Sequence, residues 1–149
     1  MAVRGNNPTR VDEKGRLKVP TDFKRRLDEE FGSETEYFIT SRDGDRAEIY
    51  PLKVWEEIEA RMATVPSMNP ARKKFEDVTN YYGQQVGYDN QGRLLLPQLL
   101  RSKARLADDV VVIGKGRHLE VVNRDRFEVS LEENKMTTAD MEALSALGI

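Results

Sequence analysis

Apolar and polar residues alternate in short stretches of this chain, and helix-like spacings of apolar residues follow. Residues 16–19 (RLKV) alternate, which predicts a half-buried strand with Arg16 and Lys18 on its open face. Phe23 and Leu27 come next, four positions apart, and predict a helix with one apolar face. Two further strands, 38–40 and 47–50, and a helix with apolar residues at 55, 58 and 62 complete this pattern.

The same order of elements returns in the second part of the chain. A strand at 93–96 precedes a helix that carries Leu100 and Ala104, and strands at 110–113 and 118–122 follow. Asn123 is a good cap for a last helix in this series. A nonapeptide pattern, Asp-x-x-Gly-Arg-Leu-x-x-Pro, starts both series, at 12–20 and again 77 residues later at 89–97. The chain is therefore predicted to be two interlocked copies of one unit.

Two segments lie outside the repeat. Residues 65–70 form a Pro-containing linker, in which Asn69 caps a helix that has inward-facing residues at 75, 78 and 82. The tail predicts a helix from Thr138 to about Leu147, whose apolar stripe needs either the chain's own core or, by slight preference, a neighbouring subunit. We thus expect a first half at 4–62, a linker and helix at 63–83, a second half at 84–132 and a helical tail at 133–149.

Composition indicates a cytoplasmic protein, since the chain has no cysteine, no apolar signal-like start and no stretch of membrane-spanning length. The net charge is −2, but its distribution is uneven. Residues 1–27 hold eight Lys/Arg against three Asp/Glu, while residues 28–60 hold three against eleven. Both nonapeptides lie in basic segments, so the field around them is expected to be positive although the whole chain is slightly acidic.

Catalytic and metal chemistry have little support in the sequence. The single histidine, His118, is flanked by Arg117 and Leu119 in a strand and is expected to be a surface or packing residue. The acidic pairs at 43/45 and 108/109 lack the ligand spacing of a calcium loop. The glycines at 114 and 116 do not open onto a helix, as a phosphate loop would. We therefore expect no enzyme activity, metal, cofactor or small-molecule substrate.

The repeated turns are the better candidates for function. Asp12 and Gly15 in one copy, and Asp89 and Gly92 in the other, fit a tight turn that is followed by an arginine. One interpretation is structural, with the aspartate capping its own turn and pairing with that arginine. The other is nucleic-acid binding, because a guanidinium can clamp a phosphate or read guanine. The first hairpin favours the second interpretation through its cations, which are Arg4, Arg10, Lys14, Arg16 and Lys18, whereas Gln91 and Leu95 replace both lysines in the second copy.

Three stretches resemble the MraZ family of the AbrB-like swapped-hairpin superfamily: RGNNPTRVDEKGRLKVP, YDNQGRLLLPQLL and VVVIGKGRHLEVVNRDRF. The resemblance covers Arg4 to about Phe127. It implies an α+β, mainly β fold, in which two intertwined β-hairpin/helix halves form a barrel with flanking helices. It also implies a nucleoid-associated regulator that binds direct repeats in the promoter of the division and cell-wall gene cluster. Rings of about eight to twelve subunits are a further implication.

These observations predict a sequence-specific, double-stranded-DNA-binding repressor. Arg16 is the expected principal DNA contact, Asp12 shapes the turn that aims it, and Arg93 is its counterpart. The supporting DNA contacts are expected to be Arg10, Lys14, Lys18 and Arg4. Two alternatives stay open: an antitoxin-like DNA binder of the same superfamily, and a self-assembling scaffold that binds no DNA.

Overall fold

The computed structural model describes residues 2–149, which form eight strands and six helices. The strands are β1 (Val3–Val11), β2 (Arg16–Lys18), β3 (Tyr37–Thr40), β4 (Ala47–Pro51), β5 (Gln84–Val86), β6 (Arg93–Leu95), β7 (Asp108–Gly116) and β8 (Leu119–Asn123). The helices are α1 (Thr21–Phe31), α2 (Leu52–Met62), α3 (Pro70–Tyr81), α4 (Gln98–Ala104), α5 (Arg124–Glu133) and α6 (Thr138–Ser145). This content confirms the α+β, mainly β class.

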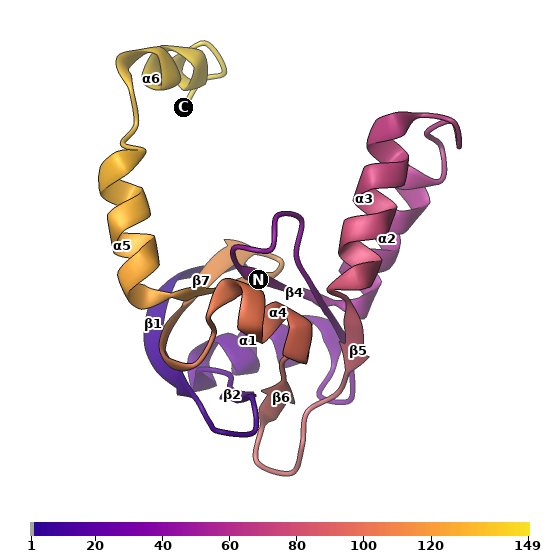
Figure 1. The fold of residues 1–149 in the computed structure, drawn as a ribbon, viewed down its shortest axis with the longest axis vertical. Coiled ribbons are helices and arrows are strands. Elements are labelled where there is room, and N and C mark those ends of the chain that lie inside the picture. Colours follow the sequence, from indigo (N-terminus) through magenta and orange to yellow (C-terminus); the bar gives the residue numbers. More distant parts are fainter. Residues whose placement is uncertain (1) are drawn as a thin grey trace.

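All eight strands belong to one antiparallel, nearly closed sheet in the order β5-β3-β4-β8-β7-β1-β2-β6 (Figure 1). β1 pairs with β7 along its whole length, from Val3 opposite Gly116 to Val11 opposite Asp108. β3 pairs in turn with β5. Each half therefore lends its first strand to the third strand of the other half, which confirms the prediction of two intertwined copies.

The register of two strand pairs reveals a local two-fold axis. Leu17 on β2 lies opposite Leu94 on β6, and these leucines hold the same place in the two nonapeptides. Glu48 on β4 lies opposite Glu120 on β8, and these glutamates are also equivalent in the repeat. A residue that lies opposite its own repeat equivalent must be next to the two-fold axis. The axis therefore passes between Leu17 and Leu94, and also between Glu48 and Glu120.

The core lies inside the sheet and under α1 and α4, the helices that follow the two nonapeptides. Leu17 and Leu94 are fully buried at the axis. Phe23 on α1 and Leu100 on α4, also repeat equivalents, are 2% and 0% exposed, as the helix spacing predicts. Burial of each such side chain stabilises the fold by roughly 1.5–3 kcal/mol relative to exposure. The same apolar contacts hold both turns in fixed positions.

Two helical arms extend from the same end of the barrel (Figure 1). In the α2–α3 arm, Trp55 is 4% exposed and packs between Phe38, Tyr50 and Phe75, with ring centroids 4.9, 5.0 and 5.9 Å away. In the α5–α6 arm, apolar side chains remain open, among them Leu131, Met141 and Leu147. None of the helices in residues 2–149 combines the length and the apolar character needed to span a bilayer.

The helix starts follow the signals in the sequence. The Asn69 side chain accepts hydrogen bonds from the backbone N–H groups of Ala71 and Arg72, and Pro70 is the first residue of α3. The Asn123 side chain caps α5 in the same way. The tail helix α6 begins at Thr138 as predicted but ends at Ser145, two residues before Leu147.

Candidate nucleic-acid interface

The turn between β1 and β2 is organised by the carboxylate of Asp12. Its Oδ1 accepts hydrogen bonds from the backbone N–H groups of Lys14, at 3.0 Å, and Arg16, at 2.8 Å. Its Oδ2 accepts one from Arg16 Nε at 2.8 Å. The pKa of Asp12 is lowered, chiefly because the backbone N–H of Arg16 bonds to its charged form and also because the Arg16 side chain does. The aspartate is thus ionised at neutral pH and fixes both the turn and the arginine.

The turn between β5 and β6 repeats this network around Asp89. Oδ1 accepts from the backbone N–H groups of Gln91 at 2.8 Å and Arg93 at 2.9 Å, and Oδ2 accepts from Arg93 Nε at 2.8 Å. The pKa of Asp89 is lowered by the same backbone bond. Gly15 and Gly92 close the two turns with φ of +84° and +72°, a region that favours glycine. Two distant segments therefore build the same aspartate–arginine unit.

The Arg16 guanidinium is oriented by this unit without being fully occupied by it. Its Nε donates a hydrogen bond to Asp12, whereas neither of its Nη atoms makes a hydrogen bond within residues 2–149. The side chain is 32% exposed. A guanidinium held at Nε keeps its outer nitrogens for a bidentate contact with a phosphate or a base edge. The pair is thus structural, and this geometry is also compatible with an arginine that binds an anion.

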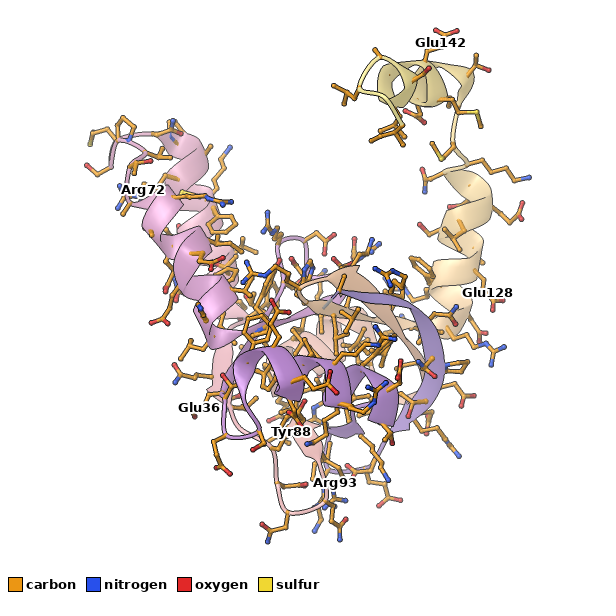
Figure 2. All side chains as sticks on the ribbon, turned by 180° about the vertical axis from the view of Figure 1, so that it is seen from behind. Glu36, Arg72, Tyr88, Arg93, Glu128 and Glu142 are labelled. Atoms are coloured by element: carbon orange, nitrogen blue, oxygen red, sulfur yellow. The ribbon has the colours of Figure 1, made fainter. Side chains whose placement is uncertain are left out.

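The pairing of β2 with β6 brings the two units together. Lys18 lies opposite Arg93, and Arg16 lies opposite Leu95, in the register of these strands. Arg93 Nη1 comes within 3.6 Å of Asp12 Oδ2, so Asp12 contacts the arginines of both copies. The connecting turns lie at the end of the barrel opposite both helical arms (Figure 1), and Figure 2 shows Arg93 at that end. The two units lie 77 positions apart in the sequence, which does not reveal that they meet.

The other predicted cations are spread unevenly around this surface. Lys14 and Lys18 are exposed, and no carboxylate of residues 2–149 lies within ion-pair distance of either. Arg10 is also exposed, but Asp108 and Asp109 lie 3.4 and 3.7 Å from its guanidinium. An open concavity beside the first turn is lined by these cations, Arg10, Lys14 and Arg16, and also by the acidic residues Asp12, Glu13 and Asp108.

Arg4 lies apart from the turn. It is on β1 in register with Lys115, near the end of that strand remote from Asp12. At about 3.3 Å per residue, eight residues of strand separate it from the turn by roughly 26 Å. The expectation that Arg4 joins the other cations around one hairpin is therefore wrong in position, although it is exposed and no acidic side chain in the described chain pairs with it.

Sequence reasoning missed one pair of residues at the turns. Arg101 on α4 lies against Gly15, and Lys24 on α1 lies against Gly92. These two cations are 77 residues apart, so the repeat offset alone could have identified them as equivalent. Each half thus places a basic side chain over the turn of the other half.

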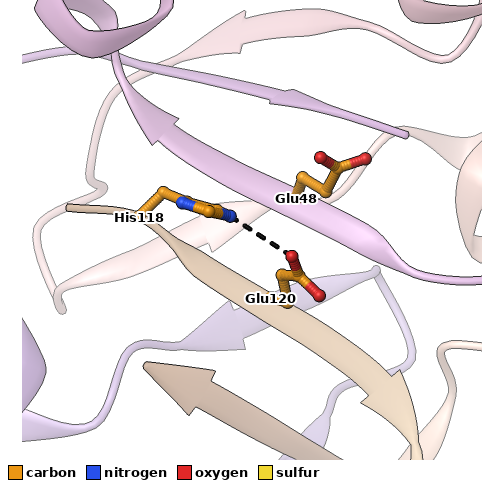
Figure 3. Close-up of side chains that lie close together, drawn as sticks. All are labelled: Glu48, His118 and Glu120. Carbon is orange, nitrogen blue, oxygen red and sulfur yellow. Dashed lines mark hydrogen bonds and ion pairs between the residues drawn. The ribbon is translucent and has the colours of Figure 1, made fainter. Parts of the chain in front are cut away.

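A second polar cluster occupies the two-fold axis, where β4 meets β8. His118 Nε2 lies 3.2 Å from Glu120 Oε2. With Glu48, these side chains place three atoms that could ligate a metal ion within 4.8 Å of one another (Figure 3). Both carboxylates are already bonded by arginine, Glu48 by Arg42 and Glu120 by Arg46. Burial acts to raise the pKa of Glu120, but hydrogen bonds from His118 and Arg46 lower it to about 2. The group is thus a charge-compensated network that holds two facing glutamates.

Comparison of the sequence with known proteins shows the family of the chain. The model of the family described as "MraZ protein, putative antitoxin-like" matches residues 2–78 and 83–146. A protein of Acidobacterium capsulatum named transcriptional regulator MraZ is 58% identical over 146 residues, covering 98% of this chain and 99% of that protein. Proteins of the same name from Koribacter versatilis and Legionella pneumophila are 46% and 33% identical, over 98% and 87% of this chain and 99% and 85% of their own lengths.

Proposed function

We propose, since the chain belongs to the MraZ family, that it is a sequence-specific DNA-binding transcriptional regulator. Its target is the promoter of the division and cell-wall gene cluster, where it binds short direct repeats and represses transcription. It acts in the cytoplasm, associated with the nucleoid, as a ring of about eight to twelve subunits. The relatives are named transcriptional regulators, in agreement with the expectation that the chain is no enzyme.

The observation that carries this proposal is the Arg16 guanidinium, which is fixed at Nε by Asp12 and makes no hydrogen bond at either Nη atom within the described chain. Such a group is preorganised, so it loses little side-chain entropy when it meets an anion. Bidentate contact with guanine O6 and N7 would discriminate against another base by roughly 1–3 kcal/mol. Phosphate contact would add affinity and salt dependence without sequence preference.

The lysines of the first turn supply the sequence-independent part of the binding. Lys14 and Lys18 flank Arg16 and have no carboxylate partner in residues 2–149. Each phosphate that a cation neutralises contributes about −0.9 to the slope of log affinity against log salt. Arg93 is the counterpart in the second copy, and its position beside Lys18 extends the same basic surface.

One such surface makes a small contact, and useful affinity therefore needs several copies on repeated sites. The open apolar side chains of α5 and α6, which include Leu131, Met141 and Leu147, support assembly because isolated exposed faces of this kind gain stability when covered. The arms lie at the end opposite the turns, so a contact made by them leaves the basic surface accessible (Figure 1).

The test is a mobility-shift titration with a duplex from the region upstream of the chain's own gene, at two salt concentrations. Arg16→Ala is expected to lower the affinity at least about 100-fold, which corresponds to roughly 2.7 kcal/mol. The thermal midpoint and the oligomer mass are expected to remain nearly unchanged, because the backbone bonds to Asp12 persist. Arg61→Ala removes the same charge from the far arm and is expected to bind like the wild type.

Other outcomes would select an alternative function. If Arg16→Ala unfolds the protein or breaks its assembly, the aspartate–arginine pair is structural only. Normal assembly of a wild-type protein that never shifts DNA would indicate the scaffold. An antitoxin-like DNA binder would bind DNA and also co-purify from its host with a toxin attached through the C-terminal arm.

A further inference from the structure

We infer that Arg101, on α4 of the second half, is an additional phosphate-contacting residue of the first turn. This inference rests on the proposed DNA binding and adds to it a residue from outside the aspartate–arginine motif. It means that the anion-binding surface around Arg16 is completed by the other copy of the repeat.

The position of Arg101 is the first argument. Its guanidinium lies so close to Gly15 that a methyl group added at that glycine would collide with Arg101 Cζ and Nε. The side chain thus rests on the peptide of the turn that also carries Lys14 and leads into Arg16. A phosphate bound at this turn would lie within reach of cations from both halves.

The second argument is that Arg101 lacks a counter-charge. No carboxylate of residues 2–149 lies within ion-pair distance of it, and its Nε atom is buried without a hydrogen-bond partner. A charged donor removed from water without a partner is unfavourable. An incoming phosphate oxygen would satisfy the charge, and the planar guanidinium suits the tetrahedral oxygens of that group.

Comparison with Lys24 shows that, within residues 2–149, only the cation over the first turn lacks a carboxylate partner. Lys24 holds the equivalent position on α1, and its Cε would lie 3.5 Å from a methyl group added at Gly92. Its Nζ, however, is 2.7 Å from Asp28 Oδ2 and lies over the Tyr88 ring at 4.5 Å from the centroid. The cation at the second turn is therefore already neutralised within its own helix.

The sequence explains the difference. Lys24 and Asp28 form an i,i+4 pair on α1, an arrangement that stabilises both helix and charge. The repeat offset of 77 carries Lys24 to Arg101 and Asp28 to Arg105. The second copy thus has a cation where the first has the carboxylate, and Arg101 is left available for an external anion.

The first experiment removes the charge and keeps the bulk of the side chain. Arg101→Met in the full chain is expected to lower affinity for the upstream duplex about tenfold, the loss of one charge-assisted contact. The salt slope is expected to become shallower by about 0.9 for each subunit in contact with the duplex. A random-sequence duplex should lose affinity by the same factor, because a phosphate contact does not read bases.

Two matched variants serve as controls. Arg101→Lys keeps the charge and is expected to retain the wild-type salt slope. Lys24→Met, at the equivalent position, is expected to leave DNA affinity unchanged, since Lys24 is engaged by Asp28. A role of Arg101 in packing alone would instead move the thermal midpoint and leave the salt slope as it is, which would overturn the inference.

The second experiment supplies the missing carboxylate. Arg105→Asp places a carboxylate four residues after Arg101, at the residue that follows the end of α4, and Arg105→Asn removes the same cation without adding an anion. Both residues tolerate the left-handed backbone of position 105, where φ is +54°. Arg105→Asp is expected to bind DNA several-fold more weakly than Arg105→Asn, and equal affinities would overturn the inference.

The outcomes separate this inference from the proposed function. If the wild type binds no DNA, the proposed function fails, and the inference fails with it. If the wild type binds and Arg101→Met binds with the same affinity and salt slope, only the assignment of Arg101 is overturned.

Discussion

The turn at Asp12–Gly15 and the turn at Asp89–Gly92 share the same backbone hydrogen bonds, but their surroundings differ in charge. Lys14 and Lys18 flank the first, whereas Gln91 and Leu95 occupy the equivalent positions of the second. The cation over the first turn, Arg101, is unpaired, and the one over the second, Lys24, is paired with Asp28. The motif itself builds the same turn twice, while the residues around it differ in charge, and in the proposed function these residues decide whether the turn binds an anion.

The same contrast extends to the helices that follow. Trp55 on α2 is buried among aromatic rings, one of them from α3, while its equivalent Phe127 on α5 is only half-buried and lies under Arg46. Figure 1 shows α3 beside α2, whereas α6 is turned away from α5. The α2–α3 arm is thus closed around its own aromatic cluster, and the α5–α6 arm keeps exposed apolar side chains for a further contact.

The largest expected effect tests the contrast between the helices. Trp55→Ala should lower the free energy of unfolding by about 3–5 kcal/mol, since it empties a closed aromatic cluster. Phe127→Ala should lower the free energy of unfolding by about 1–2 kcal/mol, because a half-buried side chain removes less apolar surface from water than a buried one. Chemical denaturation of both variants provides the measurement, and equal losses would contradict the distinction between a closed and an open arm.

The next effect concerns the facing glutamates at the two-fold axis. The pKa of Glu120 is lowered to about 2, so its charged form stabilises the fold at pH above its unfolded value of 4.5, and this stabilisation is lost as the pH falls toward 2. Glu120→Gln should therefore cost roughly 2 kcal/mol at pH 7, after allowance for solvent screening. The difference between variant and wild type should shrink as acid is added. A difference independent of pH would mean that the amide disrupts packing rather than charge.

A smaller effect distinguishes the two turn glycines. Both have positive φ, so alanine should cost about 1–2 kcal/mol at either position. Gly15→Ala must also displace Arg101, whereas Gly92→Ala meets Lys24 only at ordinary contact distance. We expect the thermal midpoint to fall further for Gly15→Ala. The reverse order would show that Arg101 does not rest on the first turn.

The smallest effect comes from exchanging the lysines between the turns. Lys14→Gln with Lys18→Leu gives the first turn the neighbours of the second, and should weaken DNA binding about tenfold, or 1.4 kcal/mol. The salt slope should become shallower by about 1.8 for each subunit in contact. The reciprocal change, Gln91→Lys with Leu95→Lys, should strengthen binding and steepen the slope. If the first exchange has no effect, these lysines do not contact DNA.

Local elements could be predicted from the sequence because their signals are local. Asn69 and Asn123 cap the helices that they were expected to cap, and Phe23 and Leu100 point into the core as their spacing predicts. The repeat also led correctly to two intertwined halves. The network around each aspartate follows from the spacing of Asp, Gly and Arg in a tight turn.

Long-range placement could not be predicted in the same way. The stretch VRGNNPTRV lacks alternation and contains Gly5 and Pro8, yet it forms the long strand β1 because β7 supplies its partner. The separation of Arg4 from the turn follows from that strand. The meeting of Arg93 with Asp12, and of Arg101 with Gly15, depends on the register of β2 with β6 and on the packing of α4, which no local pattern encodes.

The pairing of β1 with β7 has a consequence for synthesis of the chain. The β7 residues that pair with β1 lie about 100 residues later, and a ribosome adds about 5–20 residues per second. During synthesis, β1 therefore lacks its β7 partner for on the order of 5–20 s, and its backbone N–H and C=O groups do not yet make the hydrogen bonds of that strand pair. This segment is a poor template for self-association because it contains Gly5, Asn6, Asn7 and Pro8, which have low β-propensity. The residues that weaken β1 as a strand are therefore expected to reduce aggregation of the nascent protein.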